Sequence, residues 1–187
     1  MKNTLLLAAT MSGILSAQTV MAEDFKFEPE NLYFSLGATV SKLDEDGFGS
    51  ASGYQISAGY DLPYKFADAV HTAIEVGYMN SGTFDAKPTL VGTSIVTPGS
   101  EELDSLWVSG VASISFSDLT KMAGVSPSDP SSLELFARLG YDFGDDDGII
   151  YGAGLEYEVT EQISVNGEIV VGSEVKTGIF NLTYHMD

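Results

Sequence analysis

The chain has 187 residues, which is enough for one domain. It carries 27 acidic and 8 basic side chains, and the resulting net charge of −19 argues against nucleic acid as a partner. There is no cysteine, which excludes disulfides, thiolate metal sites and lipid attachment through a cysteine. No apolar run reaches the roughly 20 residues that a transmembrane helix needs.

Residues 1–22 are predicted to be a cleaved secretory signal. They open with a positive charge at Lys2, continue with an apolar core over residues 4–15, and end on a small-residue cleavage pattern at Ala22. Ala17 offers a second cleavage point, but cleavage after Ala22 leaves an acidic start and is preferred. The alternative, an anchored helix, needs a longer apolar core. Residues 23–30 then form a flexible lead-in, and residues 31–187 form the folded domain.

Eight strands are predicted downstream, because bulky apolar residues alternate there with small or polar ones. They cover residues 32–41, 51–62, 70–79, 106–116, 133–143, 149–159, 163–171 and 178–186. The longest connection, residues 80–104, contains a segment at residues 90–96 that could extend a strand. The connection of residues 117–132 is rich in serine and proline, with one helical turn expected near residues 118–122.

The hairpin of residues 133–159 indicates which face of the strands is the inside. One face carries only apolar or aromatic residues, from Leu133 in its first strand to Val159 in its second. The other face carries glycines, carboxylates and Arg138, which cannot build a dry core. The apolar face must therefore contact another oily medium. A lipid bilayer is the simplest candidate, since about 9–11 tilted residues span it as a strand.

The fold class follows from these strands: an all-β, eight-stranded, antiparallel up-and-down transmembrane β-barrel. An even number of antiparallel strands closes without an unpaired edge, as a bilayer requires. Aromatic residues also gather near both ends of the strands, where a membrane barrel has its interfacial girdles. One group comprises Tyr60, Tyr157 and Tyr184, and the other comprises Tyr54, Tyr78, Tyr141, Phe143 and Tyr151. The alternative, a soluble barrel, gives no reason for this placement.

Four segments carry a family resemblance: GYQISAGYDL, AIEVGYM, LFARLGYDFG and YGAGLEYEV. They resemble the small outer-membrane β-barrel superfamily, which includes the transmembrane domain of outer-membrane protein A and the outer-membrane protein X type barrels. The resemblance covers residues 31–186. The chain departs from the family at Met186, where such barrels usually carry a terminal aromatic that the assembly machinery recognises.

The resemblance implies a bacterial outer-membrane protein with residues 31–187 as its barrel domain and both termini in the periplasm. Residues 42–50, 80–104, 144–148 and 172–177 are then extracellular loops. Residues 63–69, 117–132 and 160–162 are periplasmic turns. We expect contact with outer-membrane lipid, lipopolysaccharide and the assembly machinery, a monomeric state, and no cofactor.

The lumen is predicted to hold a central charge network. Arg138 is the one inward-facing base, and Glu75 and Glu168 lie close to its level on their own strands. Glu134 and Glu156 are further inward-facing acids assigned to this network. At eight strands the lumen is just filled by side chains, so we interpret the network as a plug. A gated ion path is the alternative.

Two other sets of residues could carry chemistry. His71 and His185 face inward, whereas the lipid-modifying enzymes among such barrels need access to the bilayer, so no catalytic residue is predicted. The acidic run Asp145-Asp146-Asp147 is a candidate weak cation site, and similar runs occur in other extracellular loops. None has the full spacing of a calcium loop, so a solvated acidic rim is the preferred interpretation and no metal site is predicted.

The sequence therefore predicts an integral outer-membrane barrel with a non-enzymatic structural or surface-interaction role, mediated by acidic extracellular loops. A narrow channel for ions or small solutes is the first alternative. A lipid-modifying enzyme is the second. The sequence does not identify the extracellular ligand.

Overall fold

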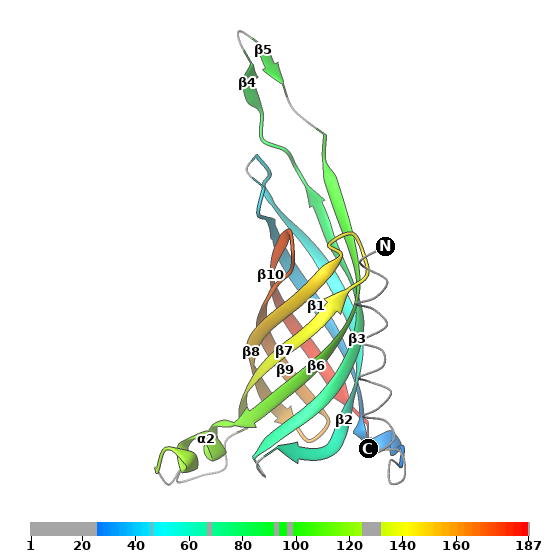
Figure 1. Cartoon of the computed structure of the whole chain (residues 1–187), viewed down its shortest axis with the longest axis vertical. Helices are drawn as coiled ribbons and strands as arrows, with labels where there is room; N and C mark the ends of the chain where they lie inside the picture. Colours follow the sequence, from blue (N-terminus) through cyan, green and yellow to red (C-terminus); the bar gives the residue numbers. More distant parts are fainter. Residues whose placement is uncertain are drawn as a thin grey trace, which may run out of the picture.

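A computed structural model of the chain describes residues 26–45, 47–66, 69–91, 94–96, 99–124 and 132–186. The predicted signal and the beginning of the predicted lead-in lie outside the described residues. Among the described residues, no helix has the length and apolar character needed to cross a membrane. The dominant feature is a closed barrel of strands (Figure 1).

The barrel contains eight strands, each paired with its neighbours in antiparallel orientation. They are β1 (Leu32–Leu43), β2 (Ser50–Phe66), β3 (Val70–Phe84), β6 (Glu101–Ser115), β7 (Leu133–Asp142), β8 (Gly148–Thr160), β9 (Ile163–Val171) and β10 (Val175–His185). They follow one another around the wall in chain order, and β1 pairs with β10 to close it. The predicted fold class is confirmed.

Four shorter elements lie outside the wall. The 3₁₀ helix η1 (Pro29–Asn31) precedes β1, and the α-helix α2 (Phe116–Met122) follows β6. β4 (Thr89–Val91) and β5 (Ser94–Val96) form a separate two-stranded sheet between β3 and β6. The C-terminus, η1 and α2 lie at one end of the barrel, which we call the periplasmic end following the predicted orientation (Figure 1). The β4–β5 sheet lies beyond the opposite, extracellular end.

Several predicted strand ends were wrong. β3 continues past residue 79 to Phe84, and β6 begins at Glu101, so much of the predicted loop of residues 80–104 is a paired extension of the wall. β10 begins at Val175 rather than at residue 178. β2 runs through Pro63, which was expected to open a turn. The register of β2 against β3 is irregular between Leu62 and Phe66, and proline is tolerated at such irregularities because no ladder N–H is required there.

The wall has its apolar side outward, as the hairpin of residues 133–159 predicted. In β1 the exposed and buried positions alternate strictly, so that Leu36 is 61% exposed while Ser35 and Thr39 are buried. Strands β7 and β8 repeat the inversion, with Leu139 and Ile149 exposed. Exposed apolar side chains around the whole wall are the surface that a bilayer would cover.

Glycine allows large aromatic side chains to fit inside the narrow lumen. Tyr33 lies directly across from Gly59 in the β1–β2 register, and Trp107 lies across from Gly77 in the β3–β6 register. A Cβ atom at either glycine would overlap the facing ring. These two cross-strand pairs therefore place aromatic rings flat against the inner wall at mid-barrel.

Candidate functional site

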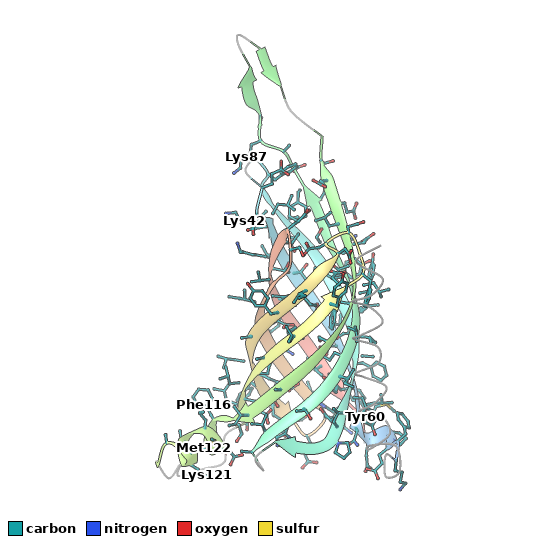
Figure 2. The ribbon with its side chains drawn as sticks, viewed as in Figure 1. Lys42, Tyr60, Lys87, Phe116, Lys121 and Met122 are labelled. Atoms are coloured by element: carbon teal, nitrogen blue, oxygen red, sulfur yellow. The ribbon has the colours of Figure 1, made fainter. Side chains whose placement is uncertain are left out.

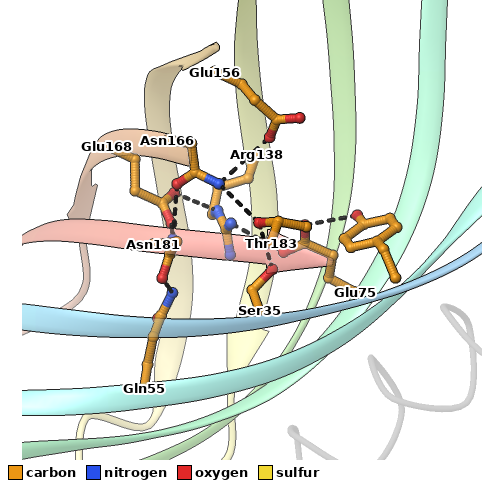
Figure 3. A network of polar contacts seen from close by, with 10 residues as sticks. Ser35, Gln55, Glu75, Arg138, Glu156, Asn166, Glu168, Asn181 and Thr183 are labelled. Atoms are coloured by element: carbon orange, nitrogen blue, oxygen red, sulfur yellow. Dashed lines mark hydrogen bonds and ion pairs between the residues drawn. The ribbon is translucent and has the colours of Figure 1, made fainter. Parts of the chain in front are cut away.

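The centre of the lumen is organised around Arg138 on β7. Its side chain is 5% exposed and forms two ion pairs. Arg138 Nη2 lies 2.9 Å from Glu75 Oε2 on β3, and Arg138 Nε lies 2.8 Å from Glu168 Oε2 on β9. The structure thus brings together the three residues that the sequence placed at one level, and it draws in strands from both sides of the barrel (Figure 3).

Each carboxylate has a second, neutral donor. The Tyr33 hydroxyl donates to Glu75 Oε1 at 2.7 Å, and Asn181 Nδ2 donates to Glu168 Oε1 at 3.3 Å. The two acids that share one guanidinium are therefore also held by a phenol and an amide. Such hydrogen bonds are what buried charges need in place of water.

A chain of amides extends the network across the lumen. Gln55 Nε2 on β2 donates to Asn181 Oδ1 on β10 at 2.8 Å, and Asn181 Nδ2 donates to Asn166 Oδ1 on β9 at 2.8 Å. Asn166 Nδ2 also lies 3.5 Å from Thr183 Oγ1, which shares a 2.9 Å hydrogen bond with Ser35 Oγ (Figure 3). Strand alternation places these amides on the inward face. The sequence could therefore have indicated their part in the lumen network, but they were not predicted as members of it.

β6 joins the network through an aromatic ring. The Arg138 guanidinium carbon lies 4.8 Å from the centre of the Trp107 ring, a cation–π contact. Trp107 is itself packed over Gly77. With this contact seven of the eight strands, all but β8, contribute a side chain to the central cluster. Strand alternation alone did not predict the contact.

Two acids predicted for the network, Glu134 and Glu156, do not contact Arg138. They are cross-strand partners on β7 and β8, and both line a cavity of about 480 Å³ nearer the periplasmic end. Glu156 Oε2 is instead 3.4 Å from Asn166 Nδ2. Their inward orientation was predicted correctly, but they lie too far along the strands to reach the guanidinium. This cavity also contains Asp61, Glu158 and Glu161, which makes it an acidic vestibule.

The extracellular part of the lumen is filled by an apolar cluster together with buried polar side chains such as Ser41, Thr177 and Asp142. Leu43, Ala51, Phe84, Leu103 and Val175 form a buried cluster, with Phe48 packed against it. We call these residues the apolar plug. Between the plug and Arg138 lies a second cavity of only about 30 Å³, lined in part by Val175 and Trp107. Arg138 lines both cavities and stands between them.

Ser164, His185 and Glu156 meet at the edge of the vestibule. Ser164 Oγ lies 3.3 Å from His185 Nε2, and Glu156 Oε1 lies 3.9 Å from the same nitrogen. In a catalytic serine–histidine–carboxylate arrangement the serine and the carboxylate bond to opposite ring nitrogens. Here both lie against one nitrogen, and Ser164 is almost completely buried. The contact was not foreseen from the sequence, because it depends on how β9 pairs with β10.

The predicted girdle aromatics lie on the outer surface near the two ends of the wall. Tyr60 stacks on Phe27 of the lead-in at the periplasmic end, with ring centres 5.2 Å apart. At the extracellular end the rings of Tyr54 and Tyr78 are 6.2 Å apart. The remaining outward rings are all exposed: Tyr141, Phe143, Tyr151, Tyr157 and Tyr184.

The three aspartates of the β7–β8 loop do not converge. Asp145 Oδ2 accepts from the backbone N–H of Asp104 at 2.9 Å, and Asp146 Oδ1 accepts from the backbone N–H of Glu174 at 2.7 Å. Asp146 is buried, which raises the pKa of its carboxyl, and it is therefore not part of a solvated rim as predicted. Asp147 bonds to the Tyr141 hydroxyl instead. No group of three or more histidine or acidic side chains among the described residues is arranged to hold a metal ion.

An inverted eight-stranded wall with aromatic girdles and a polar, side-chain-filled lumen defines a transmembrane β-barrel. Residues 5–183 match the family described as outer membrane protein beta-barrel domain. The chain belongs to this family, and it is a protein of the bacterial outer membrane. No curated protein sequence matches the chain significantly.

Solved structures of similar shape include three natural outer-membrane barrels. Ail of Yersinia pestis, in complex with the heparin analogue sucrose octasulfate, is 13% identical with a TM-score of 0.48, covering 82% of this chain and 96% of Ail. Neisserial surface protein A is 13% identical with a TM-score of 0.45, covering 83% and 97% of the two chains. OprG of Pseudomonas aeruginosa is 14% identical with a TM-score of 0.40, covering 83% and 97%.

Proposed function

We propose that this outer-membrane barrel is a non-enzymatic surface-interaction protein that acts through its extracellular side. The observation that carries the proposal is the contrast between a blocked lumen and an elongated extracellular hairpin. The apolar plug and the Arg138 network fill the lumen at two successive levels. The strands β3 and β6 meanwhile rise beyond the other strands and carry the β4–β5 sheet at their tip (Figure 1).

The base of this hairpin is braced against the neighbouring loop. Phe48 and Ala86 form an isolated antiparallel bridge, and the Gly49 N–H donates to Asp85 O at 2.9 Å. The Lys87 N–H donates to Gly47 O at 2.6 Å. These contacts hold the arm of the hairpin that follows β3, in addition to the pairing of β3 with β6, and we infer that they help to pre-position the tip. A pre-organised binding element loses less entropy when it engages a partner.

The features of the hairpin tip favour a protein as its binding partner over a polyanion. β4 and β5 pair only with each other among the described residues, so each offers an open backbone edge of the kind used in strand addition. The sequence of the two strands is largely apolar and β-branched, TLV and SIV. Exposed acids surround the hairpin base, including Glu101, Glu102 and Asp104, and they would repel sulfated or phosphorylated polymers.

A deletion of the hairpin tip tests the proposal. Cells displaying the whole chain, and cells displaying a variant in which residues 88–98 are replaced by a short Gly/Ser link, are applied to immobilised fibronectin, laminin and heparin. We expect binding to a protein surface that the variant loses, and no binding to heparin. Heat-modifiable gel mobility shows that both barrels are folded. Equal binding by the two chains on every surface would contradict the proposal.

A conductance measurement separates this role from the channel alternative. Planar bilayers containing the purified barrel should remain electrically silent, because the apolar plug stays dry and the Arg138 network lies beneath it. Reproducible single-channel steps would favour the channel instead. Lipid A from cells with and without the gene should have the same mass spectrum, since Ser164 and Glu156 contact the same nitrogen of His185. A mass difference would favour the enzyme.

The membrane-side partners are part of the same proposal. Lys42 and Lys176 are cross-strand partners on β1 and β10, exposed on the outer surface at the extracellular end. Lys176 Nζ is paired with Asp44 Oδ1 at 2.5 Å. Basic side chains at this height can contact lipopolysaccharide phosphates. Because the wall closes on itself and leaves no strand edge, a monomer inserted by the assembly machinery fits the architecture.

A further inference from the structure

The long periplasmic connection between β6 and β7 contains a helix whose sequence is amphipathic. Phe116, Leu119 and Met122 follow one another at three-residue spacing in α2 and therefore share one face. Ser117 lies on the opposite side, while Asp118 and Thr120 flank the apolar face. The helix is held by its own contacts: Ser115 Oγ accepts from the Asp118 N–H at 3.1 Å, and Thr120 Oγ1 donates to Phe116 O at 3.0 Å.

A helix that packs on a protein core buries its apolar face, whereas α2 turns its apolar face outward. Its apolar residues are exposed, with Phe116 and Leu119 at 38% and Met122 at 70%, and Lys121 is exposed as well. The polar residues Ser117, Asp118 and Thr120 are half-buried. No residue of α2 is buried. In water this apolar face would be exposed to solvent, which is unfavourable. Contact with another apolar medium would remove that cost.

The apolar face of α2 continues the lipid-facing surface of the barrel. Phe116 follows directly on β6, where Leu106 and Val108 are exposed at the same strand parity. α2 contacts the ends of β6 and β7 and projects sideways from the periplasmic end instead of closing over its mouth (Figures 1 and 2). Figure 2 places Phe116 at about the height of Tyr60, the girdle residue on the other side of the view.

We propose that α2 is an interfacial anchor that lies in the periplasmic leaflet of the outer membrane, with Phe116, Leu119 and Met122 inserted among the phospholipid chains. Amphipathic helices lie in the membrane interface in this way, with the apolar face about 5–10 Å deep. Lys121 is exposed on the side opposite the apolar face and forms a 2.8 Å ion pair with Asp118. The helix is therefore close to neutral, and its apolar face rather than its charge holds it at the membrane.

This anchor gives the long connection of residues 116–132 a physical role. Turns at the periplasmic end of such barrels are usually short, and the β8–β9 turn here fits that rule, since β8 ends at Thr160 and β9 begins at Ile163. A helix fixed in the leaflet adds a lipid contact beyond the circumference of the wall. It would fix the depth and tilt of the barrel. The proposal depends on the outer-membrane location and not on the extracellular role proposed above.

Site-specific labels test the proposal cleanly because the chain contains no cysteine. Leu119→Cys and Met122→Cys each receive one environment-sensitive fluorophore on the apolar face. Ser117→Cys serves as the matched control on the side opposite the apolar face. Its hydroxyl shares a hydrogen bond with Ser115 Oγ, which also bonds to Asp118. Leu139→Cys marks the lipid-facing wall and Glu101→Cys marks the extracellular aqueous side. Heat-modifiable mobility confirms that each full-length variant is folded.

Each labelled chain is folded into phosphatidylcholine vesicles whose acyl chains carry bromine near the headgroup or near the chain end. Bromine near the headgroup should quench the labels at Leu119 and Met122 more than twice as strongly as the label at Ser117. The chain-end bromine should quench them less than it quenches the label at Leu139. Quenching no greater than at Glu101 would overturn the proposal. So would equal quenching at all three helix positions, or shielding from bromine that grows with protein density, which would indicate a second copy on this face.

Discussion

Replacing Arg138 with alanine tests the idea that a single guanidinium holds the lumen together. The substitution leaves Glu75 and Glu168 without their cation, in sites where the carboxyl side chains are 10% and 0% exposed. Removing one member of a buried ion pair typically costs about 3–5 kcal/mol, because the partner charge remains buried. Tyr33 and Asn181 still donate to the two acids, so we expect a loss of about 4 kcal/mol rather than a larger one.

Urea unfolding in detergent micelles measures this loss. With a urea m-value of about 2 kcal/mol per M, the unfolding midpoint should fall by about 2 M. Trp107 is the chain's one tryptophan and lies against Arg138, so its emission follows the centre of the lumen directly. Lys176→Ala is the matched control. It removes a base from an exposed pair, and such pairs are worth about 0–1 kcal/mol.

A triple variant separates charge from packing. Arg138→Met, Glu75→Gln and Glu168→Gln together remove all three charges while keeping similar volumes. Neutral replacement of a whole buried ion cluster is often nearly free of cost, so the midpoint should return to within about 0.5 M of the natural chain. An unmoved midpoint in the single variant would refute the reasoning. A triple variant as unstable as the single one would show that the lost stability came from packing.

Three further outcomes are expected. Gly77→Ala should lower the free energy of unfolding by about 1–3 kcal/mol in the same urea titration, because the new Cβ overlaps the tryptophan ring, whereas Gly167→Ala, with open space beside it, should not. In planar bilayers Arg138→Ala should remain silent while the apolar plug persists, and adding Phe84→Ala should produce conductance; steps from the single variant would contradict this. Hydrogen bonds from its neighbouring lysine and N-cap serine lower the pKa of Asp118, so their contribution to α2 is present above the ordinary aspartate pKa and is lost as the pH falls through the lowered value. The electron-spin-resonance line shape of a label in α2 should therefore stay constant from pH 8 to about pH 4 and sharpen only below that; sharpening near neutral pH would contradict this.

The topology could be predicted because the bilayer imposes a strict rule on every strand. Where one face of a strand contacts lipid and the other faces the lumen, apolar side chains alternate with small or polar ones. Eight segments with this alternation could be recognised in the sequence. Family membership and outer-membrane location followed from the same segments and are confirmed. The extensions of β3 beyond residue 79 and of β6 before residue 106 could not be read this way. Above the extracellular girdle the outer face meets water and carries polar residues such as Glu102 and Asp104. The inner face there carries the buried apolar Phe84 and Leu103, so the apolar-outward pattern that marks the wall no longer holds.

The sequence predicted which side chains face the lumen, but not how far along the barrel axis each of them lies. Parity placed Glu134 and Glu156 inward, yet their distance along the strands separates them from Arg138. Contacts such as Ser164 with His185 depend on the register between two neighbouring strands, which no single strand specifies. The cation–π contact between Arg138 and Trp107 has the same origin, because it depends on how rings fold over glycines on the next strand.

The presence of β1 and β10 residues in the central cluster affects how long the protein stays folded. β1 and β10 meet only when the barrel closes, and both supply members of the cluster, Tyr33 and Asn181. The complete set of contacts can therefore form only once the barrel has closed, and we expect closure to be the rate-limiting step of folding. Interactions that form after the transition state slow unfolding without hastening folding. The Arg138 cluster should therefore slow unfolding. Its loss would shorten the lifetime of the inserted barrel while leaving its rate of insertion almost unchanged.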